Sequence, residues 1–216
     1  MSSSIEAVKE RTEELIQLVD IKSAGRATIL PVVKGFGVKE VEAMLELGLF
    51  EVGESYAQEV LRKSEILPSD NVIWHMIGNI QRNKVKKLSG IIELWHSVYR
   101  MEIIEEISKF KQDSKILIQV DMHKRYEQGG CSPEEVSSLV ESATERGLNV
   151  QGLMTIGLNQ NIEETKKTFA SLSKLSESLG LKEISMGMSD DFEIAIDHGA
   201  TILRLGRAIF GERSKE

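Results

Sequence analysis

Residues 27–37 read ATILPVVKGFG, an apolar run that ends at a lysine and a glycine-rich turn. The run Ala27–Val33 has the length and the β-branched content of a buried strand, and Gly35 and Gly37 are typical of the turn that ends it. Desolvation lowers the pKa of a lysine, and a neutral amine can attack a carbonyl carbon, so one interpretation of Lys34 is a Schiff-base lysine. The other interpretation is a strand-end lysine whose ammonium group reaches water. Both stay open on this segment alone.

Short apolar runs alternate with longer amphipathic stretches along the whole chain. This alternation predicts a parallel sheet whose strands are connected by helices. One helix, Ser4–Asp20, is expected in front of the first strand. The expected strands are Ala27–Val33, Leu49–Val52, Val72–Ile77, Ile92–Val98, Lys115–Asp121, Val150–Ile156, Glu183–Met186 and Thr201–Leu205. Eight such units predict an α/β fold, a single (β/α)8 TIM barrel with an extra N-terminal helix over residues 1–216, and the alternative is an open doubly wound sheet.

Composition and charge exclude several classes of protein. The 216 residues carry 27 basic and 34 acidic side chains, a net charge of −7, which argues against a general binder of nucleic acid or anionic membranes. The single cysteine, Cys131, excludes an internal disulfide. The start of the chain shows no secretory signal, and no apolar run reaches membrane-spanning length. We therefore expect a soluble, cytoplasmic protein.

Polar and glycine-containing segments follow the last two predicted strands, where a barrel of this kind gathers its function. Ser189 lies in the segment after the seventh strand, and Gly206 and Arg207 follow the eighth. Small residues let a backbone approach an anion, and a helix that begins there offers free amide groups. Together these loops predict a phosphate site. We expect Asp190 and Asp191 to point away from it, since their charges would repel a phosphate.

The same loops belong to longer motifs spread over nearly the whole predicted barrel. These motifs are Val33-Lys34, FEVGESYAQE (residues 50–59), WHMIGNIQRNK (74–84), His96-Ser97-Val98, GCSPEE (130–135), GLMTI (152–156), SMGMSDD (185–191) and RLGRAIFG (204–211). With them the chain resembles the pyridoxal phosphate homeostasis proteins, which are single-domain relatives of the alanine racemase barrel.

The resemblance implies a cofactor, a function and a role for particular residues. The cofactor would be pyridoxal 5′-phosphate (PLP), held as a Schiff base on Lys34 by a protein of intracellular PLP homeostasis that is not itself an enzyme. Arg204 would face the pyridine nitrogen, and Ser55 and His75 would line the same mouth. The phosphate would be held, partly through backbone amides, by Ser185, Met188, Ser189, Gly206 and Arg207.

An arginine at the ring nitrogen has a chemical consequence. A guanidinium group stays protonated and can only donate hydrogen bonds, so it keeps the pyridine nitrogen unprotonated. The ring is then a weaker electron sink than one paired with a carboxylate. Such a site would hold the aldehyde well and catalyse amino-acid chemistry poorly.

The chain departs from the family pattern at several positions near the expected pocket. Lys34 lies between Val33 and Gly35, where the family usually has serine and threonine. Ser55 replaces an asparagine, and Gln128 replaces a lysine. These departures bear on the affinity for the cofactor and on any release or transfer of it.

Two enzymatic alternatives remain open. A racemase of the alanine racemase class needs a second proton-transfer group, which that family takes from an additional β domain that we do not expect in this chain. Tyr56, Tyr99 and Tyr126 are candidates, but none lies in a matching context, so only weak racemase activity is expected. A cofactor-free Schiff-base aldolase would use Lys34 without the phosphate loops and Arg204. We also expect a monomer that passes PLP to apo-enzymes, and the spacing of the four histidines predicts no metal site.

Overall fold

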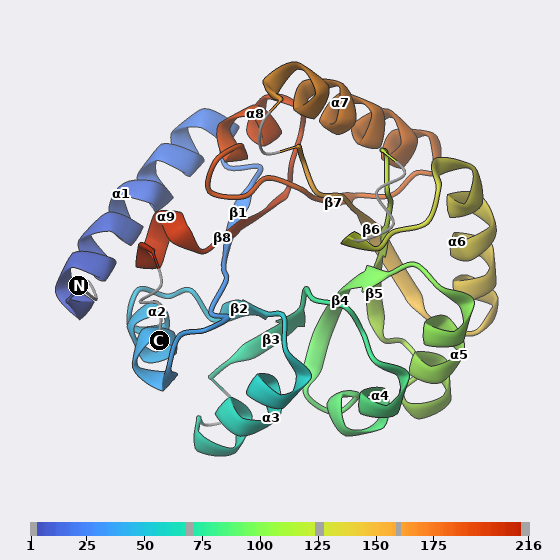
Figure 1. Ribbon diagram of the computed structural model, residues 1–216, viewed down its shortest axis with the longest axis horizontal. Coiled ribbons are helices and arrows are strands. Elements are labelled where there is room, and N and C mark those ends of the chain that lie inside the picture. Colours follow the sequence, from blue (N-terminus) through green and yellow to red (C-terminus); the bar gives the residue numbers. More distant parts are fainter. Residues whose placement is uncertain (1–3, 68–70, 124–127, 159–160, 213–216) are drawn as a thin grey trace.

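The chain folds into a closed barrel of parallel strands surrounded by helices. The computed structural model describes residues 4–67, 71–123, 128–158 and 161–212. In these ranges eight parallel strands follow one another in the order β1-β8-β7-β6-β5-β4-β3-β2. A parallel bridge between Val32 and Gly53 joins β1 to β2 and closes the ring (Figure 1). The predicted (β/α)8 barrel is confirmed, and the open doubly wound sheet is wrong.

The strands are short, and the helices lie outside them. The strands are β1 (Thr28–Pro31), β2 (Glu51–Glu54), β3 (Ile73–Met76), β4 (Ile92–Val98), β5 (Lys115–Gln119), β6 (Asn149–Met154), β7 (Glu183–Ser185) and β8 (Ile202–Leu205). The helices are α1 (Ile5–Ser23), α2 (Val38–Glu46), α3 (Ala57–Ile66), α4 (Arg82–Leu88), α5 (Met101–Phe110), α6 (Val136–Glu145, after the 3-10 turn Pro133–Glu135), α7 (Ile162–Ser178), α8 (Phe192–Asp197) and α9 (Arg207–Phe210).

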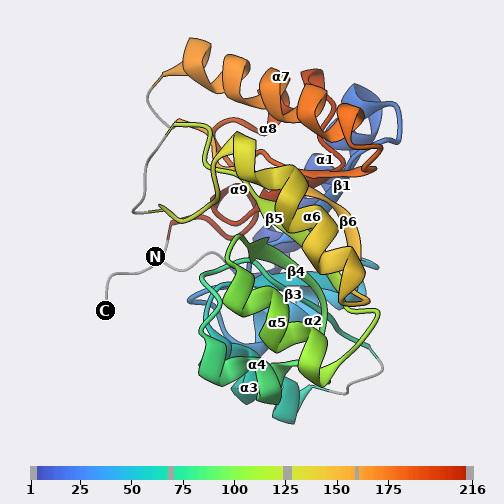
Figure 2. The ribbon, with the colours of Figure 1, turned by 90° about the vertical axis from the view of Figure 1, so that its right-hand side faces the viewer.

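Two apolar layers hold the barrel together. The larger lies between the strands and the surrounding helices, several of which Figure 2 shows from the side, and it includes the fully buried Trp95 and Phe169. The smaller fills part of the barrel interior with Leu30, Leu94, Leu117, Met154 and Ile202. Large apolar side chains in the interior make such a barrel a packed core, so a ligand can enter only at its ends.

The extra helix α1 packs against α2, which follows the first strand, and against α8 and α9, which follow the last two strands (Figure 1). Its N-cap is Ser4, whose hydroxyl accepts a hydrogen bond from the amide of Ala7 at 3.2 Å. The helix was predicted to end at Asp20 and continues to Ser23, where Ala24 ends it in the left-handed conformation with φ 52°. None of the helices in the described ranges has both the length and the apolar character needed to span a bilayer.

Pairing between neighbours decides where the strands end. The fourth strand has the predicted bounds, but the second was predicted at Leu49–Val52 and forms two residues later. Its last residues, Gly53 and Glu54, pair with His75 and Met76 of β3. The sequence analysis placed Glu54 after the strand, whereas it belongs to β2 and its carboxylate is fully buried.

Candidate functional site

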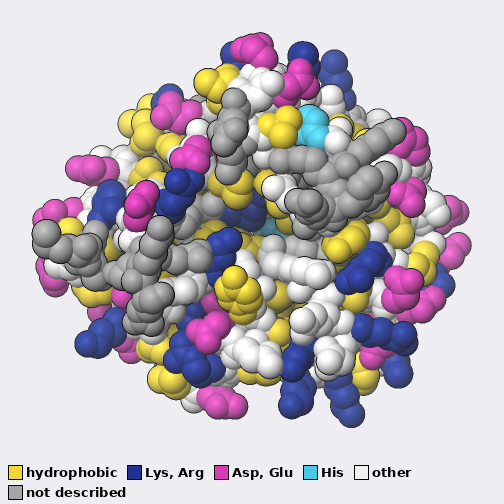
Figure 3. Space-filling view, viewed as in Figure 1, with side chains coloured by type: hydrophobic (Ala, Val, Ile, Leu, Met, Phe, Trp, Pro, Cys, Tyr) yellow, Lys and Arg dark blue, Asp and Glu magenta, His cyan; other side chains and the backbone are white. Residues whose placement is uncertain are grey.

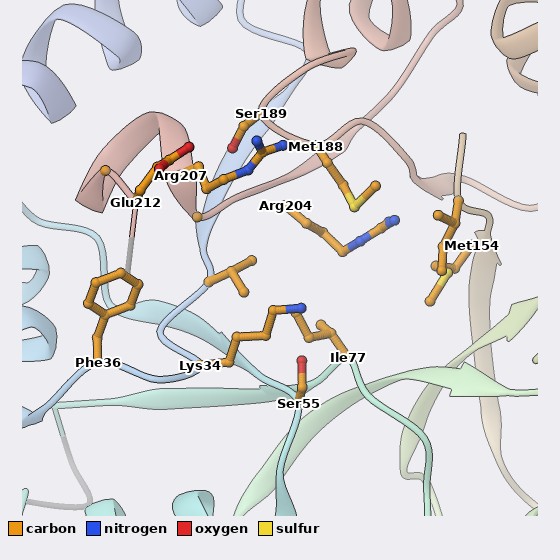
Figure 4. A pocket seen from close by; sticks show the side chains of 14 residues that line it. Lys34, Phe36, Ser55, Ile77, Met154, Met188, Ser189, Arg204, Arg207 and Glu212 are labelled. Carbon is orange, nitrogen blue, oxygen red and sulfur yellow. The ribbon is translucent and has the colours of Figure 1, made fainter. Parts of the chain in front are cut away.

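A cavity of about 530 Å³ opens at the carboxyl ends of the strands. Its walls come from the segments after β1, β2, β3, β6, β7 and β8. The lining residues are Val32, Lys34, Phe36, Ser55, Ile77, Met154, Ile156, Met188, Ser189, Arg204, Gly206, Arg207, Gly211 and Glu212. Figure 3 shows the hollow near the centre of this face, with basic side chains at its edge, and Figure 4 shows the lining residues from close by.

Lys34 lies on the wall of this cavity, half-buried, in the turn after β1. Figure 4 shows its side chain extending into the cavity, between Ser55 on one side and Arg204 on the other. In the same turn, the ring of Phe36 packs against the ring of Phe210 of α9, and the two ring centroids are 4.6 Å apart. The predicted lysine therefore lies at the mouth of the barrel, facing the eighth strand.

A buried ion pair ties the Lys34 turn to the Ser55 loop. Lys63, on α3, donates to the Glu54 carboxylate at 2.6 Å and to the carbonyl oxygen of Val33 at 2.8 Å, and both side chains are fully buried. The same carboxylate accepts hydrogen bonds from the amides of Ser55 at 2.7 Å and Tyr56 at 3.1 Å. The ion pair thus holds the Lys34 turn and the Ser55 loop in fixed positions relative to each other. The sequence analysis missed it, because a lysine in a helix usually faces water.

The loops after β7 and β8 are joined by Ser189. Its hydroxyl accepts a hydrogen bond from the amide of Ala208, in α9, at 3.0 Å. A hydroxyl that accepts in this way keeps its own proton for donation, so Ser189 can still donate to an anion in the cavity. Gly187 makes the loop possible: its φ is +90°, and a Cβ there would lie 2.6 Å from the Cβ of Ala195.

Neither aspartate after Ser189 is among the residues that line the cavity. Asp191 accepts a hydrogen bond from the amide of Met188 at 2.6 Å, and burial raises the pKa of its carboxyl group. Asp190 forms an ion pair with the cavity-lining Arg207. This pair places one negative charge at the rim that the sequence analysis did not predict.

Arg204 is buried, with 5% of its surface exposed, and its guanidinium group is held from two sides. Nη1 donates to the hydroxyl of Ser185 at 2.7 Å, and Nη2 donates to the carbonyl oxygen of Thr155 at 2.8 Å. Burial lowers the pKa of Arg204 to about 10, so the group stays charged at neutral pH. The structure therefore offers a fixed cation on the cavity wall.

Two predicted site residues lie elsewhere. Ser185 was expected to hold a phosphate, but it is fully buried inside the barrel and supports Arg204. His75 was expected at the same mouth as Ser55, but it lines a second cavity, of about 480 Å³, at the amino ends of the strands. The reason is the alternation along β3: His75 and Ile77 both point inward, and only Ile77, two residues further on, reaches the upper cavity.

His75 gives the stability of the fold a dependence on pH. Burial lowers its pKa from 6.5 to about 4; Glu93 opposes this shift, and Lys115 adds to it. The unfolded chain therefore binds the proton more readily, and stability falls as pH falls from 6.5 to 4. The difference corresponds to about 3 kcal/mol. We expect urea unfolding at a series of pH values to show this loss, and a His75→Leu variant to lose less over the same window. Equal slopes for the two proteins would contradict the prediction.

Apolar residues complete the wall, and the sequence analysis did not assign them to the site. These residues are Ile77, Met154 and Ile156. The sequence could have indicated these residues, because each lies at an inward position near the end of a predicted strand. Next to them, Gly78 lets the segment after β3 pass the Ser55 loop, since a Cβ on Gly78 would lie 2.1 Å from the carbonyl oxygen of Ser55.

Comparison with known proteins assigns the chain to a family. It matches the family model of the alanine racemase N-terminal domain over residues 4–214. A pyridoxal phosphate homeostasis protein of Aquifex aeolicus is 36% identical over 222 residues, covering 94% of this chain and 97% of that protein. The chain belongs to the pyridoxal phosphate homeostasis protein family. The fission yeast Schizosaccharomyces pombe has a member that is 34% identical, over 89% of this chain and 87% of its own.

A solved structure shows the same architecture. PipY of Synechococcus elongatus PCC7942, determined with PLP bound, superposes with a TM-score of 0.85 at 25% identity, covering 94% of this chain and all of that one. Its structure without PLP gives a TM-score of 0.83. The family assignment made from the motifs and the barrel predicted from the alternation of strands and helices are therefore confirmed.

The departures from the family pattern differ in their distance from the cavity. Ser55 lines it, and Gly35 forms the turn beside it with φ +76°. That conformation favours glycine over a β-branched residue. Gln128 is not part of the cavity wall; its carbonyl oxygen accepts a hydrogen bond from Gln119 at 2.9 Å. Of the three, Ser55 and Gly35 are placed to affect a ligand directly.

Proposed function

We propose that this protein binds PLP as a Schiff base on Lys34 and takes part in PLP homeostasis, without turning over a substrate of its own. The observation that carries the proposal is the shared cavity wall, on which Lys34, Arg204 and the Ser189–Arg207 loop pair meet. The PLP-bound structure of its relative PipY supports it.

The residues present fit each part of PLP. The cofactor supplies an aldehyde, and Lys34 is the amine that can hold it. Arg204 can donate to the ring nitrogen, because it is fixed by Ser185 and Thr155 on its other sides. Ser189 and Arg207 can donate to the phosphate. A cavity of about 530 Å³ lies within the usual range for a small ligand.

Among the described residues no tyrosine lines the cavity, and since the alanine racemase class takes its second proton-transfer group from a tyrosine, this supports a role in binding over racemisation. Of the three tyrosines, Tyr56 is exposed and Tyr99 donates to Asn79 at 3.4 Å, and neither lines the cavity. Tyr126 lies outside the described residues. No group of three or more acidic, histidine or cysteine side chains in the described ranges could hold a metal ion. A cytoplasmic location, a monomeric state and delivery of PLP to apo-enzymes belong to the same proposal.

Spectroscopy tests the proposal directly. We expect the purified protein, titrated with PLP, to develop a visible absorption band with a stoichiometry of one cofactor per chain. Reduction with borohydride should then fix the cofactor, and peptide mapping should locate it on Lys34. Added amino acids should show little or no exchange of the α-proton. A colourless protein whose Lys34 is trapped by a keto compound would instead support the aldolase.

The phosphate loops can be tested with pyridoxal, which lacks the phosphate. We expect Arg207→Gln to weaken PLP binding about three- to tenfold, as for the loss of one exposed charged hydrogen bond, and to leave pyridoxal binding unchanged. Lys87→Gln, on the exposed face of α4, is the matched control and should change neither affinity. Equal losses for both ligands in Arg207→Gln would show that the residue does not contact the phosphate.

A further inference from the structure

A row of polar side chains, buried except for the last, crosses the barrel from the cofactor cavity to the exposed Glu51 at its opposite end. Ser185, which accepts from Arg204, lies 2.9 Å from Nδ1 of His96. Nε2 of His96 lies 3.0 Å from Nδ1 of His75. Nε2 of His75 faces the carboxylate of Glu51 at 3.7 Å, at the amino end of β2. We call these five residues, Arg204, Ser185, His96, His75 and Glu51, the interior chain.

We propose that His96, His75 and Glu51 are positioning residues for the cofactor: through Ser185 they set the orientation of Arg204 at the place where the ring nitrogen of PLP would lie. This inference rests on the proposed function. None of the three lines the upper cavity. Their influence would reach the ligand through the interior chain alone.

The Glu51 carboxylate at the far end favours one direction of hydrogen bonding along the interior chain. Arg204 can only donate, so Ser185 accepts from it and has its own proton left for Nδ1 of His96. His96 then carries its proton on Nε2 and donates to Nδ1 of His75. His75 in turn carries its proton on Nε2, toward the Glu51 carboxylate. The reverse direction would aim a nitrogen lone pair of His75 at a carboxylate, which is unfavourable. Both rings are therefore expected as the Nε2–H tautomer.

Burial keeps the interior chain in this state. Ser185 and His96 are fully buried, and His75 is 3% exposed. Burial lowers the pKa of His75 to about 4 and that of His96 well below its usual range, so both rings are neutral at pH 7. A neutral imidazole donates with one nitrogen and accepts with the other, as this arrangement requires.

The position of the interior chain explains why it would control Arg204. Most barrels fill this space with branched apolar side chains, and here Leu30, Leu94 and Leu117 fill only part of it. In a dry interior a polar group without a partner is costly, so removing one member leaves the next unsatisfied. The loss would pass to Ser185 and then to Arg204, whose other hydrogen bond within the described part of the chain is to the carbonyl oxygen of Thr155.

The spectrum of bound PLP tests the proposal with variants outside the cofactor cavity. We expect His96→Leu to lower PLP affinity about tenfold and to shift the pH midpoint of the visible band, since the ring nitrogen loses its fixed donor. His96→Gln, which can accept from Ser185 and donate to His75, should restore both in part. Leu94→Met, in the same barrel interior but outside the interior chain, should change neither, although it can lower stability.

The far end of the interior chain gives a second, more demanding comparison. Glu51→Gln should shift the same midpoint in the same direction, by less. Glu183→Gln is the matched control, because Glu183 lines the same lower cavity and bonds to Thr201 at 2.6 Å, outside the interior chain. If His96→Leu and Glu51→Gln fold and leave affinity and midpoint as in the wild type, the proposal is overturned.

A measurement on the cofactor-free protein separates this proposal from the proposed function. Nitrogen-15 NMR of the histidine rings at pH 7 should show His96 and His75 neutral, with the proton on Nε2. An Nδ1–H tautomer of either ring would overturn the direction of the interior chain. Failure of the wild type to bind PLP would instead overturn the proposed function, while the ring tautomers would still decide the interior chain.

Discussion

Replacement of Lys34 by alanine is expected to abolish the visible absorption band with PLP and the covalent fixation of the cofactor by borohydride. The reason is that Lys34 is the one lysine among the described residues that lines the upper cavity. The phosphate loops and Arg204 are unchanged in this variant, so weak, non-covalent binding of PLP should remain. We expect its dissociation constant to rise by at least about tenfold.

The matched control is Lys39→Ala, five residues further on, at an exposed position at the start of α2. It removes a neighbouring amine without touching the cavity, so its spectrum and its fixation by borohydride should equal those of the wild type. Absorbance titration and mass spectrometry of the reduced proteins measure both. Fixation of one cofactor per chain in Lys34→Ala would remove Lys34 from the site.

Lys63→Met is expected to destabilise the fold by about 3–5 kcal/mol, the usual cost of removing one partner of a buried ion pair. Without Lys63, the Glu54 carboxylate and the carbonyl oxygen of Val33 lose a buried donor. The same change loosens the Lys34 turn and the Ser55 loop, so the affinity for PLP should fall as well.

Two further variants separate the ion pair from the loss of a lysine as such. Lys87→Met makes the same substitution on the exposed face of α4, and its free energy of unfolding should stay within about 0.5 kcal/mol of the wild type. Glu54→Gln combined with Lys63→Met removes the unpaired charge and should recover part of the loss. Urea unfolding measures all three. A Lys63→Met protein as stable as the wild type would mean that the Glu54 carboxylate does not need its partner.

Much of the fold follows from local patterns. The alternation of apolar runs with amphipathic stretches predicted all eight strands, and the fourth has the predicted bounds, Ile92–Val98. The second strand was misplaced: its last residue, Glu54, is charged, and its burial depends on Lys63, nine residues away on a helix. Strand ends depend on neighbours in this way, because pairing with the adjacent strand determines how far the extended backbone continues.

The candidate site was also predicted only in part from the sequence. The sequence placed Lys34, Ser55, Met188, Ser189, Arg204, Gly206 and Arg207 at strand ends, and the structure brings these residues to one cavity. It removes Ser185 and His75 from the cavity wall and places them in the barrel interior. A shift of two residues along a strand moves a side chain by one layer, about 6–7 Å, while leaving it on the same inward face. Sequence periodicity predicts which face of a strand a side chain lies on, but it does not predict which layer of the barrel interior that side chain occupies.

The sequence by itself determined the type of barrel, the strand ends that line the upper cavity and the family, because these depend on periodicity and on contiguous motifs. Only the tertiary structure decided which inward side chains share a layer, that Lys63 and Glu54 pair beneath the Lys34 turn, and that His96 and His75 connect Ser185 with Glu51. Those contacts join residues from different strands and helices. Their distances are fixed by the stagger of the strands around the closed barrel, which no local pattern in the chain encodes.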